Sequence, residues 1–311
     1  MPEPTLHGPN AEPLNGLPLY HGQRMEERWF DVAGDGGVRL RARRIAGASN
    51  DAPAILLHHG LASSQRIWDL MLPGLARRFR VVTFDARGHG LSAKPTAGYG
   101  FDHVTADAVA VIKAARLRRP IVVGHSWGAD VALALAAAHP RAVSGAVLVD
   151  GGVLRLRSSF ATWEAAKRQL APPLLAGTPL DSVRAGLARW SPVPLTPEVE
   201  AIFLSLMRVD GLGRIHPRLS RANHFRILRA IWDQDAPALH AVLTVPTLAI
   251  LAHGSADAAA FDAAKREAVQ RLKPAGSPAT FAWVEGIHDL PIQRPDVLVR
   301  RLTRFAGSAV R

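Results

Sequence analysis

The sequence contains no cysteine among its 311 residues. This absence excludes disulfides, a thiol nucleophile and thiolate metal sites, and it leaves the redox compartment open. Apolar runs are short, and none approaches the roughly 20 residues that a membrane-spanning helix needs. The first residues also lack the basic segment and apolar stretch of a secretory signal. We therefore expect a cytoplasmic protein with no membrane partner.

Aromatic residues are few, at 6% of the chain, while the net charge is high, at +12. A basic balance of this size can indicate nucleic-acid binding. Here, however, the arginines are scattered among alanines, and no long basic block or interleaved aromatic pattern occurs. We expect solvated arginines and no nucleic-acid partner.

Short apolar runs alternate with helical patterns along most of the chain, which predicts a mostly parallel sheet with helices on both faces. Two early strands, at 28–33 and 38–45, are expected to form a hairpin. The later strand candidates are 52–60, 80–85, 121–125, 143–150, 245–254 and 279–286. Helical patterns occupy 66–79, 102–117, 128–139, 261–272 and the segment after Pro295. This is an α/β fold with eight strands.

The strand rhythm breaks between residues 153 and 240, where prolines and helical patterns replace clear strands. We interpret 153–240 as a mostly helical insert in one α/β core formed by 26–152 and 241–311. Residues 1–25 are rich in Pro, Gly and Asn and are expected to be a loose N-terminal segment.

Ser126 stands between two glycines in Gly124-His125-Ser126-Trp127-Gly128, after an apolar strand and before an alanine-rich helix. The pattern G-x-S-x-G in this context indicates a nucleophile elbow, a strained strand-to-helix turn that exposes the serine hydroxyl. The helix N-terminus after Ser126 favours developing negative charge. A tight turn with an ordinary serine is the alternative.

A serine hydroxyl needs a base, and the base needs an acid to orient it. His288 follows the last strand and is the best base candidate, ahead of His253. Asp257 and Asp150 both follow strands, and both give the order Ser, Asp, His along the chain. We favour Asp257 as the acid and keep Asp150 as the alternative.

An oxyanion needs two N–H donors. The backbone N–H of Trp127 is one, and the N–H of Leu61, just past the His59-Gly60 turn, is its expected partner. Other histidines near this sheet edge, His58 and His89 among them, are expected to orient loops by hydrogen bonds. We expect neither a metal site nor a cofactor.

Together these stretches resemble the α/β-hydrolase superfamily from about residue 26 to 308. The resemblance includes "FDARGHGLS" (84–92), "GHSWG", "GSAD" (254–257) and "GIHD" (286–289). It implies that the 153–240 insert is a cap over the site and that Asp85 and Arg87 are structural. It also implies that some relatives place the acid after the sixth strand, where Asp150 stands. A serine nucleophile argues against haloalkane dehalogenase and epoxide hydrolase chemistry, which uses aspartate there.

The resemblance and the residues predict a serine hydrolase for an ester, lactone or similar activated carbonyl of a small to medium apolar substrate. Carbon–carbon bond hydrolysis and cofactor-free perhydrolysis need the same groups and stay open. A non-catalytic protein that binds a small ligand is the alternative from another class. A monomer or a homodimer is expected. Several apolar cap side chains are candidates either for a pocket roof or for packing between cap helices: Phe160, Trp163, Trp190, Phe203, Leu206, Met207 and Trp232.

Overall fold

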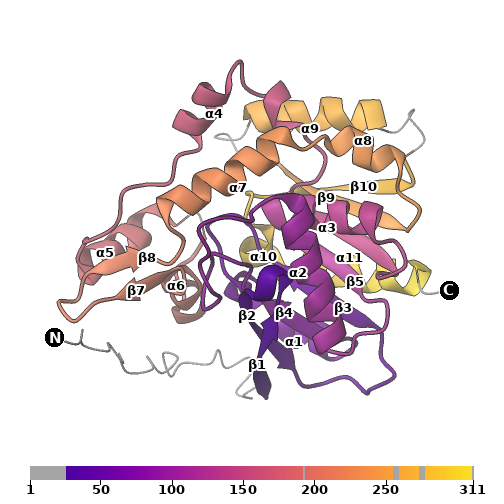
Figure 1. The fold of residues 1–311 in the computed structure, drawn as a ribbon, viewed down its shortest axis with the longest axis horizontal. Helices are drawn as coiled ribbons and strands as arrows, with labels where there is room; N and C mark the ends of the chain where they lie inside the picture. The colour runs from indigo at the N-terminus through magenta and orange to yellow at the C-terminus, as the bar shows by residue number, and fades with distance from the viewer. Residues whose placement is uncertain (1–25, 192, 255–258, 273–276, 310–311) are drawn as a thin grey trace.

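The computed structural model describes residues 26–191, 193–254, 259–272 and 277–309. The expected loose segment 1–25 lies outside these ranges. One eight-stranded sheet has the order β1-β2-β4-β3-β5-β6-β9-β10 (Figure 1). Its strands are β1 (Glu27–Ala33), β2 (Arg39–Ile45), β3 (Ala54–His58), β4 (Arg80–Phe84), β5 (Ile121–His125), β6 (Gly145–Val149), β9 (Thr247–His253) and β10 (Ala279–Glu285).

The first two strands form the expected antiparallel hairpin, with Trp29 opposite Arg43. Strand β2 is also antiparallel to β4, and all later pairs in the sheet are parallel. The predicted α/β fold with a mostly parallel eight-stranded sheet is therefore confirmed. Because the strands from β3 onward run the same way, their carboxyl ends meet at one edge.

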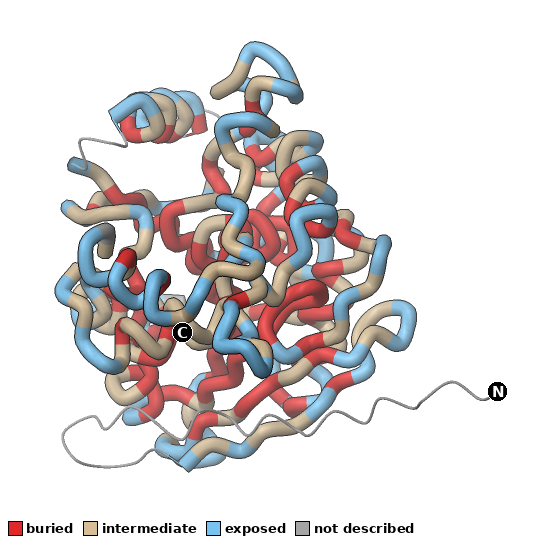
Figure 2. The backbone as a smooth tube through the Cα atoms, turned by 90° about the vertical axis from the view of Figure 1, so that its left-hand side faces the viewer, coloured by how far each residue is buried: buried red, intermediate tan, exposed pale blue. Residues whose placement is uncertain are grey.

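Side chains of the central strands alternate between two apolar layers. In β3, Leu56 faces one layer, whereas Ile55 and Leu57 face the other. The first layer includes residues of α2 (Phe101–Ala114), α3 (Trp127–Ala138) and α9 (Ala259–Leu272). The second includes residues of α1 (Leu72–Ala76) and α11 (Pro295–Ala309). Figure 2 shows the buried backbone in the middle of the molecule, which is where a sheet covered on both faces places it.

The helix expected over 66–79 is divided into a 3-10 turn, η2 (Gln65–Trp68), and the short helix α1. Pro73 lies in the first turn of α1. Proline has no backbone N–H and is tolerated in the first turn of a helix but not in its interior, so a single continuous helix through Pro73 is disfavoured.

The segment 153–240 lies beside one end of the sheet (Figure 1). Its elements are η3 (Leu156–Ser158), α4 (Trp163–Gln169), α5 (Leu180–Trp190), α6 (Pro197–Leu204), β7 (Met207–Val209), β8 (Ile215–Pro217), α7 (Arg221–Asp233) and α8 (Ala236–Ala241). The expectation that this segment lacks strands is wrong, because β7 and β8 form a small antiparallel sheet. Each strand has only three residues, too few to show alternation in the sequence.

Two further helical elements belong to the core: α10 (Leu290–Gln293) follows β10, and η1 (Asp35–Gly37) joins β1 to β2. Within the described ranges, no helix is both long enough and apolar enough to span a membrane.

Candidate active site

Ser126 lies between the end of β5 and the start of α3, as the glycine pattern predicts. Its backbone has φ 56° and ψ −122°, a conformation that L-residues rarely adopt. The surrounding structure compensates for this strain, since Ser126 N–H donates to the Val149 carbonyl at 2.9 Å. The turn therefore lifts Ser126 to the edge where the parallel strands end, and its side chain is partly exposed there.

The two glycines allow this close crossing of strand and helix. A Cβ at Gly124 would collide with the backbone of Gly128, and a Cβ at Gly128 would collide with the carbonyl of His58. Side chains at either position would separate α3 from β5 or β3. The glycines are thus a steric requirement of the elbow.

His288 lies on the loop after β10, at the same edge of the sheet, and its side chain is 54% exposed. Its Nδ1 is 2.7 Å from Asp150 Oδ2. With Asp150 ionised, Nδ1–H donates this bond and Nε2 is left as the acceptor. This is the tautomer that a general base needs to take a proton from a hydroxyl.

Asp150 directly follows β6, the strand next to β5, and has a left-handed φ of 46°. Its side chain is buried but fully engaged: Oδ1 accepts from the Ala252 N–H at 2.8 Å and from Lys265 Nζ at 3.0 Å. Burial alone would raise the pKa of Asp150, but the hydrogen bond from His288 and the nearby positive charges outweigh it and lower the pKa. Asp150 is therefore held as a carboxylate.

The pKa of His288 is shifted in the opposite direction. Desolvation lowers it, whereas the hydrogen bond and charge of Asp150 raise it, and the net pKa lies above the usual 6.5. The neighbouring ring of His125 is 4.9 Å away between centroids, and its Nε2–H donates to the His288 carbonyl at 2.9 Å. Burial and the charge of His288 lower the pKa of His125 to about 4, so His125 is neutral near pH 7.

The hydroxyl of Ser126 makes no hydrogen bond to any residue that the structure describes. Trp127 begins α3, so its N–H is one of the first helical donors without an intrahelical acceptor. Gly60 packs on the other side of the elbow, where an added Cβ would lie 3.0 Å from Ser126 Cβ. Leu61 follows Gly60, so the segment that carries one expected oxyanion donor packs against the elbow that carries the other.

Asp257, the favoured acid in the sequence, lies outside the described residues. Among the described carboxylates, Asp150 is the one hydrogen-bonded to His288. His253, the weaker base candidate, packs its ring 6.2 Å from that of Trp283.

The remaining histidines at this edge are neutral and hold the loops, as expected. His59 donates from Nδ1 to the Gly60 carbonyl at 2.8 Å and accepts at Nε2 from Ala86 N–H at 2.9 Å. Burial lowers the pKa of His58 to about 3 and that of His89 well below its usual value. No cluster of three or more potential metal ligands occurs in the part of the chain that the structure describes.

Asp85 and Arg87 are buried and hold neighbouring segments together by hydrogen bonds. Asp85 accepts from the N–H groups of Gln65 and Leu91 at 2.9 and 2.8 Å. Arg87 forms a two-pronged pair with Asp107, at 2.6 and 2.8 Å, and both side chains are buried. These contacts are what a structural role requires.

Sequence reasoning missed two buried charged residues beside the site. Lys265, on α9, contacts Asp150 directly. Asp130, one helical turn beyond Ser126, accepts from Gly152 N–H at 3.2 Å, and burial raises its pKa to about 7. A lysine or aspartate inside an amphipathic helix reads as a solvent-facing residue, so the sequence carried no signal for either.

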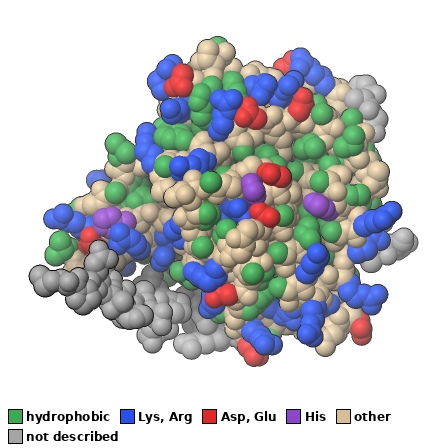
Figure 3. Space-filling model, viewed as in Figure 1, with side chains coloured by type: hydrophobic (Ala, Val, Ile, Leu, Met, Phe, Trp, Pro, Cys, Tyr) green, Lys and Arg blue, Asp and Glu red, His purple; other side chains and the backbone are tan. Residues whose placement is uncertain are grey.

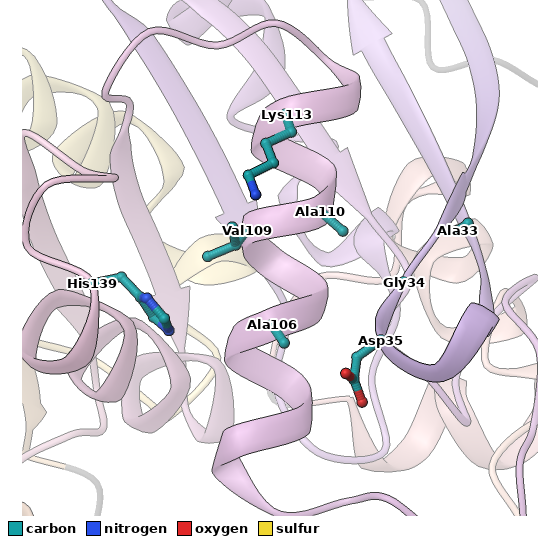
Figure 4. Close-up of a pocket in the computed structure, with 8 residues that line it drawn as sticks. All are labelled: Ala33, Gly34, Asp35, Ala106, Val109, Ala110, Lys113 and His139. Carbon is teal, nitrogen blue, oxygen red and sulfur yellow. The ribbon is translucent and has the colours of Figure 1, made fainter.

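Two surface pockets lie apart from these residues. One, of about 310 Å³, lies between the end of β1 and α2, with Asp35, Lys113 and His139 at its rim (Figure 4). The other, of about 570 Å³, lies between α4, α7 and the loop at 97–100, and combines aromatic with basic side chains. Neither contains Ser126 or His288. Lys and Arg side chains are spread over the face in Figure 3, interspersed with acidic and apolar ones.

Some aromatic side chains of the 153–240 segment pack on one another or on the apolar layers of the sheet. The rings of Trp163 and Trp232 lie 5.9 Å apart, and Phe203 packs against the apolar layer that contains α1 and α11. For these three side chains, the structure favours packing over a pocket roof.

Comparison with known proteins gives one consistent family. The family model described as alpha/beta hydrolase fold matches residues 53–180. A 2-(acetamidomethylene)succinate hydrolase of Mesorhizobium japonicum is 35% identical over 115 residues, 37% of this chain and 40% of that protein. A non-heme chloroperoxidase of Burkholderia pyrrocinia is 44% identical over 79 residues, 25% of this chain and 28% of that protein.

The chain matches about a third of the length of these curated relatives. The likeness in three dimensions is more extensive. The crystal structure of an E-2-(acetamidomethylene)succinate hydrolase superposes with a TM-score of 0.73 at 24% identity, covering 91% of this chain and 99% of that one. At this identity the likeness shows the fold, and it extends over both halves of the core. The chain therefore has the α/β-hydrolase fold, and its residues 53–180, which contain the elbow, match the alpha/beta hydrolase family model.

Proposed function

We propose that this protein is a serine hydrolase that cleaves an ester, lactone or similar activated carbonyl through an acyl-enzyme. The hydrogen bond between His288 and Asp150 beside the Ser126 elbow is the observation that carries the proposal. It supplies a base in the correct tautomer at the edge where the nucleophile is exposed. The matches to a named hydrolase support the same reaction class.

In the first half of the reaction, Ser126 Oγ bonds to the carbonyl carbon while its proton passes to His288 Nε2. The N–H groups of Leu61 and Trp127 hold the oxyanion, a contribution worth about 3 kcal/mol for each donor in comparable enzymes. The bond to the leaving group then breaks, and the leaving group takes the proton from His288. Asp150 holds the ring and stabilises the imidazolium throughout.

In the second half, water attacks the acyl-enzyme and gives a proton to His288. That proton returns to Ser126 Oγ as the acid product leaves. The two half-reactions need no group outside this chain and water. We propose Asp150 as the acid, since its carboxylate is fixed on His288 by contacts on both oxygens.

The substrate remains a small to medium apolar acyl compound in this proposal, which rests on the apolar side chains of the 153–240 segment other than Trp163, Phe203 and Trp232. That segment is proposed as the cap, and 26–152 with 241–311 as the catalytic core. The protein is proposed to act as a cytoplasmic monomer or homodimer.

The test compares p-nitrophenyl acetate and butyrate hydrolysis by the wild type, Ser126→Ala and the control Ser308→Ala. A fluorophosphonate probe, located by mass spectrometry, checks for covalent modification of Ser126. We expect hydrolysis and labelling in the wild type and the control, and neither in Ser126→Ala. Equal rates in all three proteins and an unlabelled Ser126 would reject the mechanism, and ligand binding without catalysis would replace it.

The match to a non-heme chloroperoxidase favours a second candidate, perhydrolysis. Hydrogen peroxide would take the place of water in the second half-reaction, so that the acyl group leaves as a peracid and the serine is restored. The test is halogenation of monochlorodimedone in acetate buffer with bromide and peroxide. Ser126-dependent halogenation supports this candidate, and its absence from an active esterase rejects it.

A further inference from the structure

A buried lysine contacts the carboxylate that holds His288. Lys265 lies on α9, and its side chain is 7% exposed. Its Nζ donates to Asp150 Oδ1 at 3.0 Å and to the Ala252 carbonyl at 2.5 Å, and it pairs with Asp262 Oδ1 at 2.9 Å. An ammonium group out of water is costly unless such partners surround it, so this position is specialised.

These contacts divide the two oxygens of Asp150 between two tasks. Oδ1 accepts from Lys265 and from the Ala252 N–H, whereas Oδ2 is left for His288 Nδ1. Because Oδ1 accepts two hydrogen bonds, the carboxylate cannot rotate about the Cβ–Cγ bond without breaking both of them. The plane of the carboxylate is therefore set from α9 and β9, on the side away from His288.

We propose that Lys265 is a positioning residue of the active site. It fixes Asp150 in the orientation that accepts the His288 hydrogen bond, and it partly neutralises the negative charge that Asp150 presents to His288. This inference rests on the proposed function, in which His288 is the general base. Lys265 touches neither the nucleophile nor the base. It acts through Asp150.

The charges around His288 give the direction of this effect. Several elements carry ionisable groups that face it: Asp150 after β6, Asp289 on its own loop, His125 in the elbow, Asp130 on α3 and Lys265 on α9. Asp150 and Asp289 raise the pKa of His288, and Lys265 lowers it. His125 is neutral near pH 7, and burial raises the pKa of the Asp130 carboxyl to about 7. Lys265 is thus the cation that lowers the pKa of His288, whereas the two carboxylates raise it.

The primary variants are Lys265→Met, which removes the charge at similar length, and Lys265→Arg, which keeps it. Two quantities are measured in each: the pKa of His288 by NMR of isotope-labelled histidine, assigned with His288→Asn, and the acid limb of kcat/KM for p-nitrophenyl butyrate. We expect Lys265→Met to raise both by about half to one pH unit. Lys265→Arg should stay near the wild type. An unmoved His288 pKa in a folded Lys265→Met protein would overturn the proposal.

Lys265→Met leaves two buried carboxylates without their cation and can fail to fold. Asp262→Asn is the second variant, because it keeps Lys265. In the wild type, Asp262 Oδ2 accepts a hydrogen bond from the Gly254 N–H at 2.8 Å, and the asparagine oxygen can still accept it. Without the negative charge of Asp262, the positive charge of Lys265 is balanced by the Asp150 carboxylate alone. The pKa of His288 should then fall, opposite to the change in Lys265→Met. A rise, or no change, contradicts the inference.

The two proposals fail in different ways. If the wild type hydrolyses no ester and Ser126 is not labelled, the proposed function is wrong, yet the NMR titrations of His288 in the same variants still test Lys265. If the wild type is active and the titrations do not move, the serine mechanism stands and Lys265 is only a structural ion pair.

Discussion

His288 Nδ1 lies 2.7 Å from Asp150 Oδ2, although 138 positions separate the two residues in the chain. The loop after β6 and the loop after β10 meet at the sheet edge where Ser126 turns into α3. A carboxylate held on both oxygens and a ring whose Nε2 is left as the acceptor are the geometric basis of the proposed reaction. Four predictions follow from these and neighbouring contacts, apart from the tests given with each proposal.

Asp150→Asn and Asp257→Asn are expected to differ sharply. Asparagine at 150 offers no negative charge to Nδ1 and favours the wrong ring tautomer, so kcat should fall by roughly 10³–10⁴-fold, as loss of triad acids does. Asp257→Asn should stay within a few-fold of the wild type in ester hydrolysis. The reverse pattern would assign the acid role to Asp257.

Activity should depend on a base that titrates above 6.5. His288 must be neutral to accept the Ser126 proton, and the net effect of Asp150 is to raise its pKa above that value. We therefore expect kcat/KM to increase with pH through an acid limb centred above 6.5, and to be low at pH 5. The control His253→Asn should keep the same limb. A limb centred below 6 would show that Asp150 does not raise the pKa of the base.

Stability should respond to pH through Asp130. Burial raises its folded-state pKa to about 7 from 3.8, so the folded state binds a proton more tightly than the unfolded state. The stabilisation is complete below about pH 4 and is lost as the pH rises through about 7. Asp130→Asn, which keeps an acceptor for the Gly152 N–H, removes this loss.

Urea unfolding at pH 4.5 and pH 8 measures this effect. Between pH 4.5 and pH 8 the wild type should lose on the order of 2–4 kcal/mol more unfolding free energy than Asp130→Asn does. Asp181→Asn, an exposed carboxylate on α5, is the control and should follow the wild type. An equal change in unfolding free energy between the two pH values for the wild type and Asp130→Asn would mean that burial does not raise the pKa of Asp130.

Gly124 should tolerate no side chain. An alanine Cβ would collide with the Gly128 backbone at the crossing of β5 and α3, and both elements lie in the core. We expect Gly124→Ala to lower the unfolding free energy by about 3 kcal/mol or more, or to prevent folding. Gly211→Ala is the matched control, because nothing lies within 4 Å of its Cβ position. Equal melting temperatures for the two variants would contradict the steric account.

Most of the fold was predictable from local patterns. Buried parallel strands read as short apolar runs, and the glycines and proline beside them mark where they end. The hairpin β7–β8 was missed because three-residue strands have no period to detect. The helix expected over 102–117 also differs in its bounds, since α2 begins at Phe101 with Gly100 as its N-cap and ends at Ala114.

The nucleophile elbow was determined by the sequence itself, because a strained strand-to-helix turn needs its glycines at fixed spacing from the serine. The partner of His288 was not. Strands β6 and β9 are neighbours in the sheet, so aspartates after either one are candidates on sequence grounds. Only the packed loops placed Asp150 on His288, and only the docking of α9 brought Lys265 to Asp150, because contacts between distant segments depend on packing that no local pattern encodes.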